Sequence, residues 1–378
     1  MEAIRQIHAE NNTDDVLFVH TVLIPQIPGS GELKTKPTQH SYKELMSNGI
    51  KPDVIIIRSD GKLTPSARAK ISLFCDVPKD AIVESENVDL IYEVPLVFKR
   101  QGLDEFILKS LSLGKKELKT HAWEEMCNRF KEAKEEVEIA LVGKYVQLHD
   151  AYLSVSLALI DAGYENGAVV KIRWINSEEI TRDNVAEKLK GINGIIIPGG
   201  FGGRGTEGMI ETSKYAREND IPYFGICYGL QIAAIDIARN VLGYTTASST
   251  EIDPQTPFPI IDLLENQVHV ENLGGTLRLG NYPCTLSENS LAKKLYGEDK
   301  ILERHRHRYE FNNKYRGEFR KAGVEFSGIN EDLDLVEILE LPKNKFFLGC
   351  QFHPEFKSRP NHVHPLFKGF IKAALENK

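Results

Sequence analysis

Pro222-Tyr223-Phe224-Gly225-Ile226-Cys227-Tyr228-Gly229-Leu230 combines the pattern of a buried strand with that of a tight turn. An apolar run reaches a cysteine that stands between two glycines, and a second apolar run follows as far as Ala238. The glycines permit a turn that larger side chains would crowd. A nucleophile at such a strand-to-helix turn is typical of the nucleophile elbow of α/β enzymes. We therefore predict that Cys227 is a reactive thiol and that residues 230–238 form a buried helix.

The alternative for Cys227 is an inert core position, because most free cysteines behave as small buried hydrophobes. The flanking glycines favour the nucleophile, and the N-terminus of the following helix would favour its thiolate form. A thiol nucleophile also needs a base and a residue that orients that base.

The segment Gln351-Phe352-His353-Pro354-Glu355 offers both of these partners. The apolar run Phe346–Cys350 precedes it, so a strand would deliver His353 to the carboxyl end of a sheet. Taken alone, a His-Pro-Glu turn is an ordinary surface feature. Together with Cys227 it predicts a catalytic triad completed by Glu355.

A glycine-rich segment, Pro198–Gly203, directly follows the apolar run Ile195–Ile197. Such a loop can direct backbone N–H groups at the oxyanion that forms during acyl transfer. A plain flexible turn and a phosphate-binding loop are the alternatives, but the sequence contains no GxxxxGK[ST] phosphate loop. We therefore predict that this loop serves the same site as Cys227.

A charged run over Glu303–Glu310 alternates arginines with other residues. Most charge runs are solvated faces, and a solvated strand face is the alternative here. Strand alternation would place Arg304, Arg306 and Arg308 on one face. An arginine on that face could hold a substrate carboxylate with two parallel N–H groups.

The composition suits a globular enzyme of a reducing compartment. The chain has 378 residues, of which 41% are hydrophobic and 27% charged, and its net charge is −7. This balance argues against a basic nucleic-acid binder, and no apolar run approaches the roughly 18 residues of a membrane span. The start lacks the apolar core of a signal peptide, and the five cysteines include no CxxC pair, which argues against disulfides or zinc. We therefore expect a cytoplasmic protein that binds neither nucleic acid nor membrane.

Apolar β-branched runs alternate with helical patterns along the chain, which predicts the α/β class. A polar segment after Leu113 interrupts the alternation, a helix follows, and the alternation restarts after Glu136. We predict two doubly wound, mostly parallel sheets, of which the first is incomplete because its part of the chain contains few strands for a free-standing core. The expected domains are residues 1–113 and 137–378, with a linker and helix at 114–136.

The motifs around Cys227 and His353 together resemble the class I glutamine amidotransferases, whose α/β domains carry a Cys-His-Glu triad. The chain also resembles the CTP synthase family across essentially its whole length. The segments that carry this resemblance are Lys34–Ser41, Ile57–Asp60, Arg68–Lys70, Pro198–Gly202, Gly225–Cys227, Glu303–Glu310 and Phe352–Glu355. Matches of this kind imply an amidotransferase domain at 137–378 beside the C-terminal part of a synthetase domain at 1–113.

The resemblance implies how the second domain would hydrolyse glutamine. Cys227 would attack the side-chain amide to form a glutamyl thioester, His353 would transfer the protons, and Glu355 would orient His353. The implied glutamine-binding residues are Gly200 in the oxyanion hole, Tyr228 and Gln231 beside the pocket, and Glu251 and Arg308 at the α-amino and α-carboxylate groups. Tyr228 stands where a smaller aliphatic residue is usual.

The resemblance also implies a synthetase reaction, in which ATP phosphorylates the O4 atom of UTP and ammonia displaces the phosphate to give CTP. The implied contacts of UTP or CTP are Lys34, Thr35, Lys36, Pro37, Thr38, Gln39 and Lys70, and those near the ATP base are Glu86, Asn87 and Val88. From the residues alone, these lysines would be ordinary surface charges. GTP is the implied effector, and the implied assembly is a homo-oligomer, which is a tetramer in the family.

One departure from the family limits what we expect of this chain. The family's phosphate-binding glycine loop and magnesium carboxylates belong to an N-terminal portion that we do not find here, so we expect no metal ligands in this sequence. ATP and magnesium would serve the full reaction, while this chain would retain the glutaminase half only. The alternatives are a class I amidotransferase that serves another acceptor and a catalytically silent regulatory module.

Overall fold

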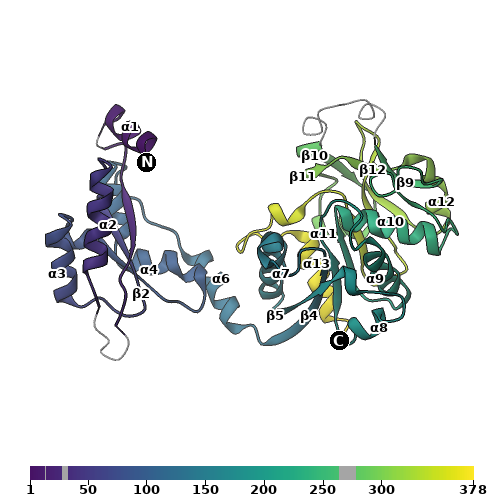
Figure 1. Ribbon diagram of the computed structural model, residues 1–378, viewed down its shortest axis with the longest axis horizontal. Coiled ribbons are helices and arrows are strands. Elements are labelled where there is room, and N and C mark those ends of the chain that lie inside the picture. The colour runs from purple at the N-terminus through teal and green to yellow at the C-terminus, as the bar shows by residue number, and fades with distance from the viewer. Residues whose placement is uncertain (13, 28–32, 264–277) are drawn as a thin grey trace. The chain divides into compact units, whose positions relative to one another are not determined.

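The computed structural model describes residues 1–12, 14–27, 33–263 and 278–378. The chain forms two compact units, Met1–Asn128 and Arg129–Lys378, and each contains parallel strands with helices packed against them (Figure 1). The predicted α/β class is confirmed for both units. The division falls inside α6 (His121–Glu132), the helix that follows the polar segment.

A nine-stranded sheet forms the framework of the unit Arg129–Lys378. Its parallel strands lie in the order β15 (Phe347–Cys350), β7 (Tyr223–Ile226), β6 (Gly194–Ile197), β4 (Glu135–Gly143) and β5 (Ala168–Asn176). These strands are continuous apolar runs in the sequence, as suits strands covered on both faces. β7 brings Cys227 to the carboxyl end of the parallel strands, beside the end of β15.

The rest of this sheet is antiparallel, an extension that we did not predict. Its strands continue from β15 in the order β14 (Leu335–Glu340), β13 (Glu325–Asn330), β10 (Arg278–Leu286) and β11 (Lys300–His307). Only residues 331–334 separate β13 from β14, and so short a link pairs strands antiparallel. β11 alternates exposed and buried residues along its length, as expected for a strand with one face toward solvent.

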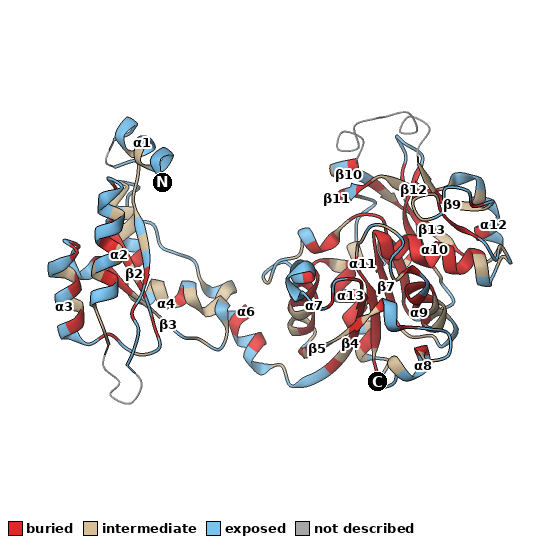
Figure 2. Cartoon of the chain, in the orientation of Figure 1, coloured by how far each residue is buried: buried red, intermediate tan, exposed pale blue. Residues whose placement is uncertain are grey.

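Helices cover both faces of the parallel strands (Figure 1, Figure 2). Ile195 and Ile197 of β6 belong to one buried cluster, together with residues of α9 (Thr206–Glu218) and α10 (Tyr228–Asn240). Ile196 belongs to another, together with residues of α7 (Leu153–Glu165) and α13 (Pro365–Leu375). Because successive strand residues point to opposite faces, the sheet lies buried between two helical layers.

Smaller elements complete this unit. They are β8 (Ser248–Ser249), β9 (Pro259–Leu263) and β12 (Tyr309–Phe311), which form a second sheet, and α8 (Val185–Lys188), α11 (Leu291–Tyr296) and α12 (Arg316–Lys321). The charged run 303–310 therefore spans β11 and β12, and Arg308 lies between the two strands.

The unit Met1–Asn128 is built on three parallel strands, with β2 (Val54–Ser59) between β1 (Val19–Leu23) and β3 (Ile82–Glu86). Its helices are α1 (Glu2–Glu10), α2 (Lys36–Ser47), α3 (Pro65–Phe74), α4 (Val94–Arg100) and α5 (Leu103–Ser110). The β-branched run of β2 is buried against α2, α3 and α5. This core is smaller than either buried cluster of the other unit.

All five cysteines of the chain are free and buried. Of the five, Cys227 adopts a positive φ. Within the described segments, no helix combines the length and the apolar character needed to cross a membrane.

Candidate active site

Cys227 occupies a strained turn between β7 and α10, with φ at 50° and ψ at −95°. A non-glycine residue held in such a conformation costs about 1–3 kcal/mol, which the surrounding structure must offset. A Cβ atom at Gly225 would lie 2.6 Å from the carbonyl oxygen of Gly229, and one at Gly229 would lie 2.3 Å from that of Ile197. The two glycines are therefore required, because only their lack of a side chain lets α10 approach β6 and β7 so closely.

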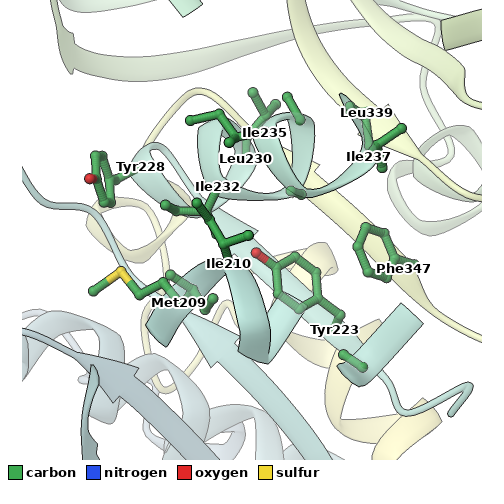
Figure 3. Packing of buried hydrophobic residues seen from close by; sticks show 14 of the residues in the cluster. Met209, Ile210, Tyr223, Tyr228, Leu230, Ile232, Ile235, Ile237, Leu339 and Phe347 are labelled. Atoms are coloured by element: carbon green, nitrogen blue, oxygen red, sulfur yellow. The ribbon is translucent and has the colours of Figure 1, made fainter. Parts of the chain in front are cut away.

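The helix after the elbow is buried, as the sequence predicted. Every residue from Tyr228 to Ala238 is buried. Figure 3 shows the aliphatic side chains of α10 among Tyr223, Leu339 and Phe347, which belong to β7, β14 and β15. This packing anchors α10 against the sheet and so supports the strained turn before it.

The structure brings Cys227, His353 and Glu355 together. The Nδ1 atom of His353 lies 2.7 Å from Oε1 of Glu355, and His353 and Cys227 line the same cavity. The backbone N–H of Cys227 donates to the carbonyl of Cys350 at 2.6 Å, and that of His353 donates to Arg304 at 2.8 Å. The end of β15 thus fixes the positions of the sulfur and the imidazole together.

The charges around His353 favour its protonated form. Burial is the largest influence and lowers the pKa of His353, but the Cys227 sulfur and the Glu355 carboxylate outweigh it and raise this pKa to about 11. The arrangement therefore supports a protonated imidazole beside the sulfur at neutral pH.

The glycine loop after β6 closes over this pair. A Cβ atom at Gly199 would lie 2.8 Å from Cε1 of His353 and 3.7 Å from Cβ of Cys227, so a side chain at this position would crowd the imidazole. Gly200 follows and lines the cavities on either side of Cys227. Bare backbone at this point leaves N–H groups accessible to a reacting carbonyl group.

Two side chains that the sequence did not assign to this role hold the glycine loop in place. Lys144, which follows β4, donates from Nζ to the carbonyl of Phe201 at 2.9 Å and to that of Gly202. Its ammonium lies 4.1 Å above the ring centre of Tyr228, whose hydroxyl donates to Gly202 at 3.0 Å. Since that hydroxyl has one proton, the hydroxyl of Thr206, 2.6 Å away, must donate to it. Tyr228 therefore packs against the loop, and Figure 3 shows its hydroxyl directed away from the aliphatic residues of α10.

A cavity of about 170 Å³ lies beside the sulfur. It is smaller than the roughly 300–1,000 Å³ of sites for drug-sized ligands, so it suits a ligand the size of one amino acid. Its wall includes Gly200, Phe201, Cys227, Gln231, Glu251, His307, Arg308 and Tyr309. Four of the predicted glutamine-binding residues thus meet here, while the fifth, Tyr228, contacts the glycine loop.

Charged groups of both signs face this cavity. Arg304 and Arg306 are exposed on β11 as alternation predicted, and Arg308 lies beyond the strand end against the cavity. The buried Nε atom of Arg308 has no hydrogen-bond partner among the described residues. Glu251 accepts a hydrogen bond from the backbone N–H of Gly202 at 2.8 Å, which ties the acidic side of the cavity to the glycine loop.

A second, larger cavity of about 480 Å³ borders Cys227 as well. Its wall includes His353, Glu355, Arg306, Tyr145 and the glycine loop. Cys227 therefore borders two cavities, although the residue is only 2% exposed.

A buried network of charges supports the strand end that carries Arg308. Arg278 donates to Glu310 at 3.1 Å and to Glu337 at 2.6 Å, and the rings of His305 and His307 lie 2.9 Å apart, nitrogen to nitrogen. Burial, with smaller contributions from Arg278 and His353, lowers the pKa of His305 to about 2, so this ring is neutral. Removing one partner of such a network costs about 3–5 kcal/mol, because a charge is left buried and unpaired.

In the unit Met1–Asn128, four of the predicted nucleotide contacts line a hollow of about 610 Å³. Lys34, Thr35, Lys36 and Lys70 lie on its wall, with Lys62 as an additional cation. Pro37, Thr38 and Gln39 belong to α2 and do not line it, and Thr38 is fully buried. Glu86, Asn87 and Val88 lie at and beyond the end of β3, where Asn87 donates to Asp60 at 2.9 Å.

Comparison with known proteins agrees with this architecture. The family model for class I glutamine amidotransferases matches residues 147–373. The glutaminase domain of Trypanosoma brucei CTPS with bound acivicin superposes with a TM-score of 0.60 at 35% identity, over 64% of this chain and 95% of that domain.

The rest of the chain matches as well. The family model for the CTP synthase N-terminus matches residues 1–113, so this domain is represented here. CTP synthase from Clostridium kluyveri is 52% identical over all 378 residues, which correspond to 70% of its length. CTP synthase from Staphylococcus epidermidis is 50% identical over 99% of this chain and 70% of its own length. The chain belongs to the CTP synthase family.

CTP synthases are ligases that use glutamine as the amide donor, and the matched amidotransferase domain contains the Cys227 site. Over the part of the chain that the structure describes, no group of three or more His, Cys, Asp or Glu side chains could hold a metal ion. Magnesium in nucleotide enzymes is held largely by the phosphates of its substrates, with one or two carboxylates, and we derive no step through the ion.

Proposed function

We propose that this chain hydrolyses glutamine at Cys227, His353 and Glu355, and that the ammonia serves the conversion of UTP to CTP. The observation that carries the proposal is the geometry of Cys227, which is strained at the end of β7 and shares a cavity wall with an imidazole held by Glu355. Family membership supports the choice of acceptor over any other class I amidotransferase reaction.

Glutamine would bind in the cavity of about 170 Å³ beside the sulfur. The unpartnered Nε atom of Arg308 supports contact with the α-carboxylate, since a buried guanidinium donor gains most from an anionic acceptor. Glu251 would accept from the α-ammonium group, and Gln231 would line the side-chain end of the pocket.

The first chemical step would form a thioester. The Cys227 thiolate attacks the amide carbon of the glutamine side chain, and backbone N–H groups at Gly200 stabilise the oxyanion. The C–N bond then breaks as protonated His353 gives its proton to the leaving nitrogen, which departs as ammonia. Glu355 keeps the imidazole oriented throughout through its contact with Nδ1.

The second step would release glutamate. Neutral His353 takes a proton from a water molecule while that water attacks the thioester carbon. The C–S bond breaks, and Cys227 leaves as a thiolate beside a protonated imidazole. The cycle thus consumes glutamine and water and yields glutamate and ammonia.

The unit Met1–Asn128 would contribute to the binding of UTP. Lys34, Lys36, Lys62 and Lys70 surround one hollow, and four cations at one site suit a triphosphate. ATP would activate the O4 atom of UTP with its base near Glu86–Val88, and ammonia would displace the phosphate. We propose that the site at Cys227 performs the glutaminase half of this reaction.

Three further properties implied by the family stay predictions for this chain. They are activation by GTP, assembly into a homo-oligomer and a cytoplasmic location. Glutaminase assays with and without GTP, sizing of the purified chain, and cell fractionation would test them in turn.

The test of the proposed function is the release of glutamate from glutamine by the purified chain, with and without a thiol-reactive glutamine analogue. We expect release that the analogue abolishes, with one molecule bound to Cys227 by peptide mass spectrometry. Release that persists after labelling of Cys227, or labelling at another cysteine, would contradict the assignment. A parallel assay with UTP, ATP and glutamine would measure whether this chain also forms CTP.

A further inference from the structure

Gln351 makes a contact with the nucleophile that the proposed mechanism does not use. Its side chain is fully buried, and its Nε2 atom donates to Sγ of Cys227 at 3.5 Å. Its Oε1 atom accepts a hydrogen bond from Nε2 of Gln231 at 3.3 Å. The two amides thus form a short chain that ends on the sulfur.

The donor and acceptor of each hydrogen bond between these amides follow from the contacts of Gln231. Nε2 of Gln231 also donates to the backbone carbonyl of Tyr309 at 3.1 Å, and a carbonyl can only accept. The NH₂ group of Gln231 must therefore face Tyr309 and Gln351, which leaves the oxygen of Gln351 facing Gln231 and its NH₂ group facing Cys227. An amide flip is excluded by hydrogen-bond logic, although nitrogen and oxygen are otherwise easily interchanged.

The backbone holds Gln351 at this place. Its N–H donates to the carbonyl of Glu337 on β14 at 2.8 Å, and the preceding carbonyl of Cys350 accepts from the N–H of Cys227. The same strand end therefore sets both the sulfur and the amide that touches it.

We propose that Gln351 is a further catalytic residue, which donates a hydrogen bond to the Cys227 thiolate, and that Gln231 is the residue that positions it. This inference rests on the proposed function of Cys227. A hydrogen bond to an anionic acceptor is stronger than one to a neutral atom, so the contact favours the thiolate over the thiol. The sulfur is anionic before acylation and again as the C–S bond breaks, so Gln351 acts at both points and least in the thioester.

Other groups also bear on the charge of this sulfur. His353 and Glu355 approach it from the segment after β15, and Cys350 lies at the end of that strand. Glu251 and Arg308 face it across the small cavity. Gln351 donates a hydrogen bond to the sulfur and carries no charge of its own.

The test compares Gln351→Glu with Gln351→Met in the full chain, with Gln255→Glu as a control. An ionised carboxylate cannot donate and adds a negative charge beside the sulfur, while methionine removes the donor without adding charge. Gln255 is exposed, so its variant introduces the same charge change away from the site. The first readout is alkylation of Cys227 by iodoacetamide across pH, without substrate and followed by peptide mass spectrometry.

We expect the pH midpoint of alkylation to rise by about one unit in Gln351→Met and by more in Gln351→Glu, with kcat for glutamine reduced about tenfold or more. Gln255→Glu should match the wild type. An unchanged midpoint in both Gln351 variants would overturn the inference, even where Cys227→Ser abolishes hydrolysis and so upholds the proposed function. Hydrolysis that survives in Cys227→Ser would instead overturn the proposed function.

Gln231→Leu tests the positioning role in the same assay. Without Gln231, the oxygen of Gln351 loses its hydrogen-bond donor, so the Gln351 amide should donate less well to the sulfur. The pH midpoint of Cys227 alkylation should therefore rise, but by less than in Gln351→Met. The double variant Gln231→Leu/Gln351→Met should shift no further than Gln351→Met alone. Additive shifts would refute the role given to Gln231.

Discussion

The unit Arg129–Lys378 buries the groups that would perform its chemistry, whereas the unit Met1–Asn128 exposes them. Glu355 is buried and Cys227 is 2% exposed, at the centre of a nine-stranded sheet. Lys36, Lys62 and Lys70 are exposed around a hollow beside a sheet of three strands. A strained backbone persists only where its surroundings over-determine it, and the larger core provides that support. Exposed lysines need no such support, because each cation acts through its charge rather than through one fixed geometry.

The largest expected effect of a mutation in either unit comes from replacing the Cys227 sulfur. Cys227→Ser should reduce glutamine hydrolysis by about 10⁴-fold or more, because a hydroxyl is a far poorer nucleophile near neutral pH. The matched control is Cys75→Ser, which changes a buried thiol in the other unit and should leave hydrolysis in place. Steady-state glutaminase assays would measure both, and substantial turnover in Cys227→Ser would remove the elbow from the mechanism.

Arg308→Ala should raise the KM for glutamine by about 10- to 100-fold, since a buried guanidinium contact to a carboxylate contributes about 1.5–3 kcal/mol. Its effect on kcat should be smaller, because the α-carboxylate is held in the ground state as well as in the transition state. Arg182→Ala removes an exposed arginine and serves as the charge control. An unchanged KM in Arg308→Ala would show that glutamine binds elsewhere.

Lys144→Met should lower kcat about tenfold near pH 7, because an ammonium no longer holds the carbonyls of Phe201 and Gly202. Burial, the largest influence, lowers the pKa of Lys144 to about 8. The wild-type lysine is therefore charged below pH 8 and loses its proton above it, so activity should decline as the pH rises through about 8. This alkaline decline should be absent from the pH profile of Lys144→Met, and a decline that persists there would assign it to another group.

Lys70→Ala should weaken the binding of UTP by only about three- to tenfold, as expected for one exposed charge among several. Lys43 is exposed on α2 and does not line the hollow, so Lys43→Ala is the matched control. Titration calorimetry with UTP would compare the two. Equal losses in both variants would indicate a diffuse charge effect and no site at this hollow.

Tyr228→Phe should have the smallest effect, a decrease in kcat of about three- to fivefold, because it removes one hydrogen-bonding hydroxyl from the glycine loop. Burial raises the pKa of Tyr228 to about 12, so the hydroxyl keeps its proton over the whole working range and the loss should not depend on pH. A loss that grows toward alkaline pH would contradict this role.

The sequence was most informative at positions where close packing permits only one type of residue. Gly225 and Gly229 predicted the elbow around Cys227. The structure gives the reason, because a side chain at either glycine would collide with backbone atoms. The His353 segment was found because a strand delivers it, and the structure brings it to Cys227. Their catalytic roles stay predictions, supported by the geometry.

The other features of the fold and the site depend on contacts between residues far apart in the sequence, and no local sequence pattern indicates such contacts. The antiparallel strands β10, β11, β13 and β14 pair with one another and with β15 across long stretches of sequence, and no local pattern specifies these partners. Lys144 follows a strand end, which could have marked it, but its partners Phe201 and Gly202 lie more than 50 residues away. Gln351 stood beside the His353 motif, yet its amide direction depends on Gln231 and Tyr309 from other elements.

The close approach at Gly225 and Gly229 also limits how this protein can change through mutation. A Cβ at either position would lie within 2.6 Å of a backbone oxygen, and backbone cannot move aside as a flexible side chain can. Most neighbouring positions in α10 can exchange one apolar residue for another of similar volume at modest cost. At these two positions even a single methyl group would force the helix away from the sheet. Main-chain packing alone therefore requires glycine at these two positions, whatever reaction the nucleophile performs.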